Sequence, residues 1–117
     1  MDYTWNLVAL RKTNNENFND IVIWAEWKLT GIDAEGYSGS FSGGSEFKFN
    51  TIDPNNFIDF NNLTEEIVLN WIKPEVLSNG NYLEHIQARI QEEINQKKHP
   101  ITSVGDNEFP WLTTNAP

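Results

Sequence analysis

Glycine and serine recur in the segment from Thr30 to Phe49, which reads TGIDAEGYSGSFSGGSEFKF. This segment has the most residues that could do chemistry. This composition could form a phosphate-binding loop, a nucleophile turn or a calcium loop. A phosphate-binding loop needs a lysine after its last glycine, but the segment Gly43–Glu46 reads Gly-Gly-Ser-Glu. A nucleophile elbow needs a serine at the centre of Gly-x-Ser-x-Gly, and Phe41 occupies that centre. Both of these sites are therefore excluded.

A calcium loop of the EF-hand type needs oxygen ligands at alternate positions before its glycine, which would be Gly36. Gly31 fills the first of these positions, so that only Asp33 and Glu35 remain as ligands. We expect no calcium site here. The stretch is instead typical of a β-hairpin region, because glycine permits positive φ and serine satisfies exposed backbone groups.

The two histidines, His85 and His99, are the remaining candidates for catalysis or metal binding. They show no metal-ligand spacing, and the chain has no cysteine to supply a thiolate or a nucleophile. His85 precedes the apolar Ile86 and is interpreted as a helix flank residue, and His99 as a cation at a helix C-terminus. The 17 acidic residues offer carboxylate pairs, but no spacing marks a catalytic one. We expect no catalytic residue, no metal, no cofactor and no enzyme activity.

Length and charge restrict the class of protein further. A chain of 117 residues is expected to form a single domain over residues 1–117. The longest apolar run, Ile21–Trp27, is far shorter than the roughly 20 residues of a membrane span, and the N-terminal MDYTW lacks a signal pattern. We expect a cytosolic origin and no membrane contact. The formal charge of -9 repels phosphate backbones, so nucleic acid is not expected as a partner.

The pattern of the chain predicts an α+β fold. We expect a small antiparallel sheet of three to four strands over residues 3–60, helices over residues 65–73 and 82–98, and an extended tail over residues 100–117. The tail, which contains Phe109, Pro110 and Trp111, is expected to dock on the same chain or on a neighbour.

The strands alternate apolar and polar side chains. In Tyr3–Leu10 one side carries Tyr3, Trp5, Leu7 and Ala9, and Ile21–Thr30 is rich in β-branched and aromatic residues. A tight turn at Asp33–Gly36 should return the chain as a strand from Tyr37 to Phe41. We expect Ser42–Ser45 to break this strand, Phe47 and Phe49 to point inward after the break, and Asp53–Asn56 to form another turn.

Two helices should complete the fold. Thr64 is the expected cap of the first, whose apolar stripe would be Ile67, Val68, Trp71 and Ile72, with Pro74 ending it near Ile72. The second would be capped by Asn81 and stopped by Pro100. Its expected stripe consists of Tyr82 or Leu83 with Ile86, Ile90 and Ile94.

The aromatic residues are the candidates for an interface. Trp24 shares a strand face with Glu26 and Lys28, opposite Trp27, so it could meet a partner. The expected interface set is Trp24, Tyr37, Phe41, Phe47, Phe109 and Trp111. An alternative role is a sugar-stacking platform made from Trp24, Tyr37 and Trp111.

Several segments together resemble a known family. They are YTWNLVAL, WAEWKLTGIDAEGYSGSFSGGSEF, LTEEIVLNWI and HIQARIQEEINQKKHP followed by a Pro-Trp pair, and they cover nearly the whole chain. The chain resembles small, mostly uncharacterised proteins encoded by tailed bacteriophages, notably those that infect cyanobacteria. It departs from that pattern in having Ser40 in place of threonine and a longer Asn-rich loop at Asn14–Asn19.

The resemblance implies a phage origin and a role in the virion. The expected function is that of a structural or accessory protein that decorates or cements the capsid, or lies in the neck or tail. It would be assembled in the host cytoplasm in multiple copies and would contact other virion proteins. An alternative is an intracellular effector that inhibits a host enzyme, and a weaker one is a carbohydrate-binding module.

Overall fold

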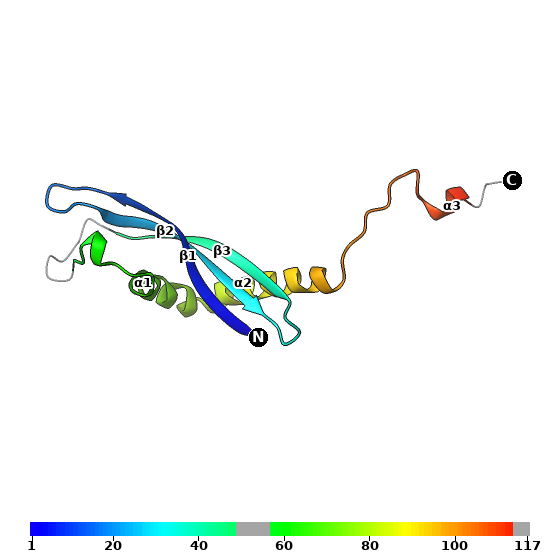
Figure 1. Cartoon of the computed structure of the whole chain (residues 1–117), viewed down its shortest axis with the longest axis horizontal. Coiled ribbons are helices and arrows are strands. Elements are labelled where there is room, and N and C mark those ends of the chain that lie inside the picture. Colours follow the sequence, from blue (N-terminus) through cyan, green and yellow to red (C-terminus); the bar gives the residue numbers. More distant parts are fainter. Residues whose placement is uncertain (49–56, 114–117) are drawn as a thin grey trace.

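A three-stranded antiparallel sheet and two helices form the body of the protein. The structure is a computed structural model that describes residues 1–48 and 57–113. The strands β1 (Asp2–Thr13), β2 (Ile21–Ile32) and β3 (Ser38–Glu46) pair in the order β1-β2-β3. Helices α1 (Glu65–Ser78) and α2 (Gly80–Lys98) lie along the same face of this sheet (Figure 1). The predicted α+β class is confirmed.

Strand β1 is longer than predicted and contains a bulge. Leu7 pairs with Trp27, but Ala9 pairs with Glu26, so one residue of β1 is skipped between them. Glu26 lies on the face opposite Trp27, and Ala9 therefore turns away from the helices. The prediction that Ala9 shares a side with Leu7 was wrong, because alternation alone cannot reveal an inserted residue.

Strand β3 runs through the segment where we predicted a break. Gly43 pairs with Trp27, and a Cβ on Gly43 would overlap the Trp27 indole. A Cβ on Gly44 would likewise overlap the indole of Trp24. The two glycines thus leave room for two tryptophan rings and do not end the strand. Phe49 and the turn predicted at Asp53–Asn56 lie outside the described residues.

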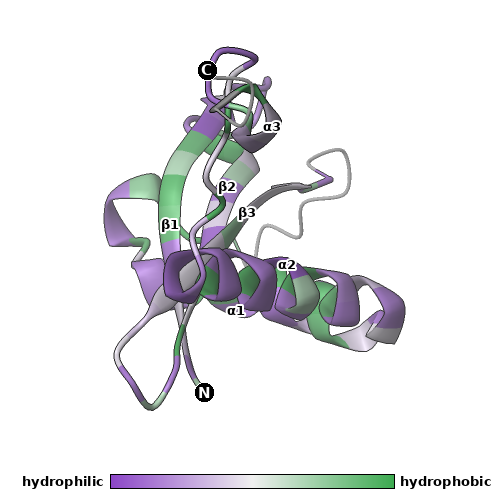
Figure 2. Ribbon diagram, turned by 90° about the vertical axis from the view of Figure 1, so that its right-hand side faces the viewer, coloured by the Kyte–Doolittle hydropathy of each residue, from purple (hydrophilic) through white to green (hydrophobic). Residues whose placement is uncertain are grey.

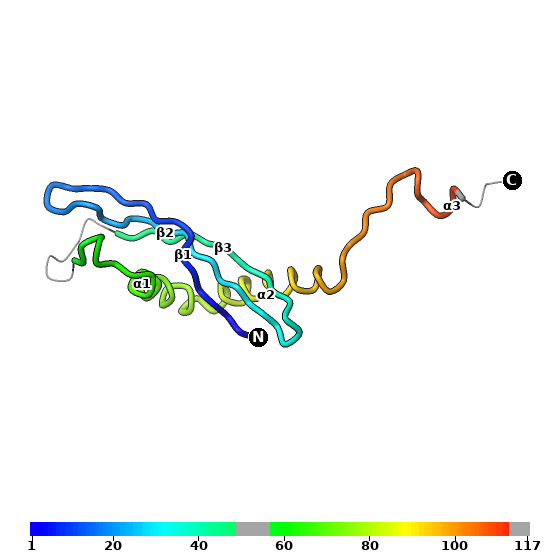
Figure 3. Tube along the Cα trace, in the orientation of Figure 1, coloured from blue at the N-terminus to red at the C-terminus, as the bar shows by residue number. Residues whose placement is uncertain are grey.

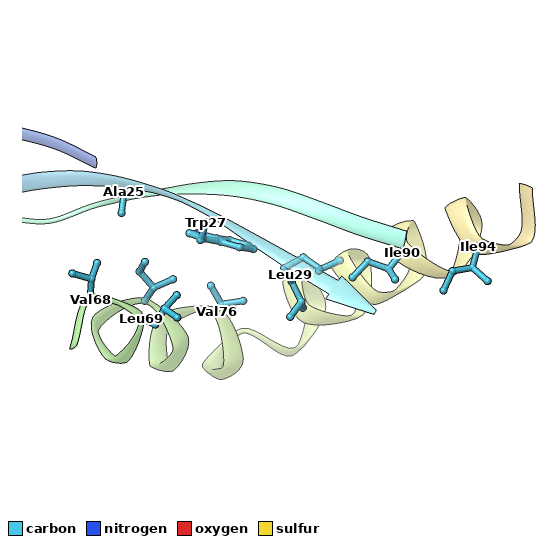
Figure 4. Close-up of a cluster of buried hydrophobic side chains, with 10 residues drawn as sticks. Ala25, Trp27, Leu29, Val68, Leu69, Val76, Ile90 and Ile94 are labelled. Atoms are coloured by element: carbon cyan, nitrogen blue, oxygen red, sulfur yellow. The ribbon is translucent and has the colours of Figure 1, made fainter. Parts of the chain in front are cut away.

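The core lies between β2 and the two helices (Figure 4). Trp27 is fully buried at its centre, and Trp5 packs against it with ring centroids 5.2 Å apart. The other buried members of the core are Ala25, Leu29, Val68, Leu69, Ile72, Val76, Ile86, Ile90 and Ile94.

Helix α1 begins as predicted and ends later. The N–H of Ile67 donates to Thr64 Oγ1 at 3.2 Å, which confirms the cap. The helix continues past Pro74 to Ser78, because Val76 is buried in the core and holds the last turn in place. Proline removes the hydrogen bond to the carbonyl of Asn70, and Asn70 is exposed to water. A 3₁₀ turn, η1 (Phe60–Asn62), precedes this helix.

Helix α2 carries the predicted stripe of Ile86, Ile90 and Ile94, all fully buried. Its cap is Asn79, whose Oδ1 accepts the N–H of Tyr82 at 3.1 Å, two residues earlier than the predicted Asn81. Hydrophilic residues cover much of the surface of this helix, with hydrophobic segments between them (Figure 2). No helix within the described ranges is long and apolar enough to cross a membrane.

Beyond α2 the chain forms an extended arm, which we define as residues 99–113. It runs away from the sheet and the helices and ends in the short helix α3 (Pro110–Thr113) (Figure 3). The arm makes the molecule long and narrow, with principal extents of 83 × 30 × 25 Å.

Candidate functional site

The glycine- and serine-rich stretch forms the hairpin between β2 and β3. In its turn, Asp33 Oδ1 accepts the N–H groups of Glu35 and Tyr37, each at 3.0 Å. Gly36 has a φ of +89°, a conformation that glycine adopts without strain. The turn predicted at Asp33–Gly36 is confirmed. The side chain of Asp33 stabilises this turn through its two hydrogen bonds from backbone N–H groups.

A lysine from α2 meets the same turn. Lys98 Nζ lies 2.7 Å from Asp33 Oδ2 and 3.4 Å from Glu35 Oε1. The hydrogen bond from Lys98 lowers the pKa of Asp33, and the same bond raises the pKa of Lys98. Asp33 and Glu35, the two residues that could have been ligands in a calcium loop, therefore both contact the ammonium group of Lys98. Within the described residues, no three His, Asp or Glu side chains gather in a way that could hold a metal ion.

Charged side chains of the helices also bind the two edges of the sheet. Glu65 Oε2 accepts the N–H of Leu7 in β1 at 3.1 Å. At the other edge, Glu93 Oε2 accepts the N–H of Ser40 at 3.0 Å, and Lys97 Nζ donates to the carbonyl of Ser38. These bonds satisfy backbone groups that would otherwise be open for pairing with another chain. The sequence gives no signal for them, since the partners are more than 50 residues apart.

The histidines lie on the outside of α2. His85 is exposed, and its ring stands edge-on to Phe41 with centroids 5.8 Å apart. His99 follows the last turn of α2, where its N–H donates to the carbonyl of Asn95 at 2.8 Å. Both positions agree with the interpretation of these residues as a helix flank residue and a helix-terminal residue.

Trp24 lies on the face of the sheet that the helices leave open. It is half-buried, and the guanidinium of Arg11 in β1 lies 4.2 Å from its ring centroid. An arginine over an indole face is a favourable cation-π contact. Trp24 and Arg11 together form a flat aromatic and cationic surface on the outer side of the sheet.

The other rings predicted for an interface lie in three separate places. Tyr37 is exposed at the β2–β3 turn, with Lys98 Nζ 5.5 Å from its ring centroid. Phe41 and Phe47 are half-buried and pack against the core of their own chain. The structure therefore places Trp24, Tyr37 and Trp111 on different parts of the molecule, and they do not form one platform.

Phe109 and Trp111 form an aromatic cluster on the arm. Their rings stack with centroids 4.6 Å apart and planes 23° from parallel. Trp111 is 60% exposed, and the neighbouring Leu112 is also exposed. We call Phe109, Trp111 and Leu112 the arm cluster. Figure 1 shows that α3, which contains Trp111 and Leu112, lies far from the sheet and from α1 and α2.

An open groove of about 700 Å³ lies at the end of the body where β2 begins. Its apolar lining includes Trp71, which is 38% exposed and stands edge-on to Phe47 with centroids 5.5 Å apart. The prediction that Trp71 belongs to the buried stripe was wrong. The stripe is formed by Val68, Leu69, Ile72 and Val76, which leaves Trp71 on its flank. The remaining lining residues of the groove are Asp20, Ile21, Val22, Glu46, Lys48, Phe57, Ile58, Leu63 and Glu75.

Comparison with known proteins identifies the family of the chain. Residues 1–111 match the family described as "Domain of unknown function (DUF7936)". No curated protein and no solved structure matches the chain. Because the match spans the whole described body and most of the arm, the protein belongs to the DUF7936 family.

Proposed function

We propose that the protein is a structural or accessory component of a tailed-phage particle and acts by contact with other proteins. Its place would be in the capsid, as a decoration or cement protein, or in the neck or tail. The observation that carries the proposal is the arm, which runs away from the body (Figure 1) and carries the stacked rings of Phe109 and Trp111. Aromatic side chains of this kind supply much of the energy of protein interfaces.

The body does not need the arm to form its core. Every residue of the buried core cluster lies between Ala25 and Ile94, before the arm begins. Ile101 and Val104 of the arm, which are 81% and 52% exposed, therefore stabilise little within their own chain. A neighbouring protein that covers them would gain this burial, which supports a role in an assembly.

The open face of the sheet offers a second contact surface. The guanidinium of Arg11 lies over the flat indole ring of Trp24 on this face. Tryptophan and arginine are enriched among the residues that dominate the binding energy of protein interfaces. The net charge of -9 keeps free copies apart in solution until specific contacts form. The sequence resemblance to tailed-phage proteins supports the particle as the place of assembly.

Incorporation into particles tests this proposal. We compare particles made with the wild-type chain, with Trp24→Ala and with a chain that lacks the residues after Val104. Both variants should fold, because neither change touches the buried core, and both should be lost from the particles. Unchanged occupancy of both variants would reject the proposal. A wild-type protein found only in the infected cell would support the alternative of an intracellular effector that binds a host enzyme.

A further inference from the structure

We propose that the arm cluster of one copy docks in the groove of a second copy, which joins the molecules head to tail. This inference rests on the proposed function, because it names one of the contacts by which the protein would assemble.

The groove and the arm lie at opposite ends of the body. The groove adjoins Ile21 and Val22 at the start of β2, whereas α2 ends beside the turn at Asp33 that follows β2. In Figure 1, the arm leaves the body at the end opposite to the turn that joins β1 to β2. Two complementary surfaces at opposite ends of one molecule give a heterologous contact, which builds a ring or an open chain of copies.

The chemistry of the groove suits the arm cluster. Its described walls contain the aromatic rings of Phe47, Phe57 and Trp71, and Ile58 and Trp71 are exposed there. A groove of this size and lining is suited to apolar and aromatic groups. The arm cluster is an exposed apolar group of that kind in the described chain, and its docking would remove both surfaces from water.

The reach of the arm favours a second copy over the same copy. The groove lies near the start of β2, and the 12 residues of this strand span roughly 36 Å. From His99 to Phe109 the arm has ten residue steps, which cover at most roughly 33–36 Å when fully extended. A copy could place the cluster in its own groove only with a taut arm, whereas a neighbour imposes no such strain.

Electrostatic repulsion sets the conditions for this contact. The groove lining carries the acids Glu46 and Glu75 beside Lys48, and the arm carries Asp106 and Glu108. These acids repel one another at low ionic strength, so added salt should strengthen the association. Apolar burial would drive the contact, and the acids would weaken it in dilute buffer.

Cysteine cross-linking of the full chain tests the inference, because the natural chain has no cysteine. One variant carries Leu112→Cys in the arm cluster, and another carries Glu75→Cys at the rim of the groove. Oxidation of the mixture should give a disulfide between the two peptides, identified by mass spectrometry. A mixture of Leu112→Cys with Asn6→Cys, on the open face of the sheet, is the matched control and should give none.

The double variant Leu112→Cys with Glu75→Cys separates the two possible docking modes. Docking between copies should give a ladder of covalent oligomers that grows with protein concentration. A covalent monomer at every dilution would show that the arm folds back, and the absence of any arm-to-groove disulfide would show that the groove has another occupant. Either result overturns the inference.

Sedimentation velocity of the full chain gives an independent measurement. The wild-type chain should associate as its concentration and the salt concentration rise, and Trp111→Glu or Ile58→Glu should weaken this association by roughly 30-fold or more. Leu77→Glu, at an exposed position of α1 outside the groove lining, should leave it unchanged. Equal association of all four chains would contradict the docking. If cross-linking fails while the protein is present in particles, the inference falls and the proposed function stands.

Discussion

Lys98 Nζ lies 2.7 Å from Asp33 Oδ2, and this contact joins the last turn of α2 to the turn between β2 and β3. Both side chains are largely covered, at 25% and 14% exposed. Because the arm begins directly after Lys98, this ion pair fixes the point from which the arm leaves the body.

The ion pair should make stability depend on pH in the acid range. The pKa of Asp33 is lowered from 3.8 in the folded protein, so its contribution is complete above pH 3.8 and is lost as pH falls through the lowered value. The pKa of Lys98 is raised from 10.5, so its contribution is complete below pH 10.5 and is lost as pH rises through the raised value. Urea unfolding from pH 2 to 6 should show less loss of stability on acidification for Lys98→Met than for the wild type. Lys73→Met is the control and should keep the pH dependence of the wild type. An equal pH dependence of Lys98→Met and the wild type would argue against the ion pair.

Gly39 should tolerate no side chain. A Cβ at this position would overlap the carbonyl oxygen of Ile90 in α2, which is backbone and cannot turn aside. We expect Gly39→Ala to lower the free energy of unfolding by about 1–3 kcal/mol or more, measured by chemical denaturation. Gly80→Ala has open space around the new methyl group and should leave stability unchanged or raise it by up to about 1 kcal/mol. Equal effects of the two changes would contradict the close packing of α2 on β3.

Ile90 should be one of the most costly core residues to truncate. It is fully buried, and its Cγ2 approaches Gly31 of β2 closely. Ile90→Ala should cost about 2–5 kcal/mol of stability, because it removes apolar contacts and leaves a cavity. Leu77→Ala, at a position that is 51% exposed, should change stability by no more than about 0.5 kcal/mol. A similar thermal midpoint for both variants would show that α2 does not pack on the sheet as described.

Trp111→Ala should leave the stability of the body unchanged. The ring belongs to the arm and is 60% exposed, whereas the core cluster ends at Ile94. We expect the same denaturation midpoint as the wild type under dilute conditions, where copies do not associate. A loss of about 2 kcal/mol or more would mean that the arm packs on its own body in solution.

The sequence predicts the elements well where hydrophobic periodicity is strong. The pattern of Ile21–Thr30 identified strand β2, and the spacing of Ile86, Ile90 and Ile94 identified the buried face of α2. Local polar chemistry identified Thr64 as a helix cap. These signals depend on the residues near each position, so they can be read without knowledge of the fold.

Features that depend on contacts between distant residues could not be predicted. Gly43 and Gly44 suggested a strand break, but they make room for tryptophan rings of the neighbouring strand. Trp71 suggested a core residue, but the buried stripe of α1 runs beside it and leaves it in the groove. The described lining of the groove comes from stretches that lie far apart in the sequence, from Asp20 to Glu75.

Quantitative mass spectrometry of purified particles tests the central claim most directly. The proposed function implies a tailed phage that encodes the chain. Particles of such a phage would be banded on a density gradient and treated with nuclease, and peptides of this chain would be counted against those of the major capsid protein. Under the proposed function, the chain should stay with the particles in a fixed ratio to a capsid, neck or tail protein. Recovery of the chain only from the soluble fraction of infected cells would contradict it.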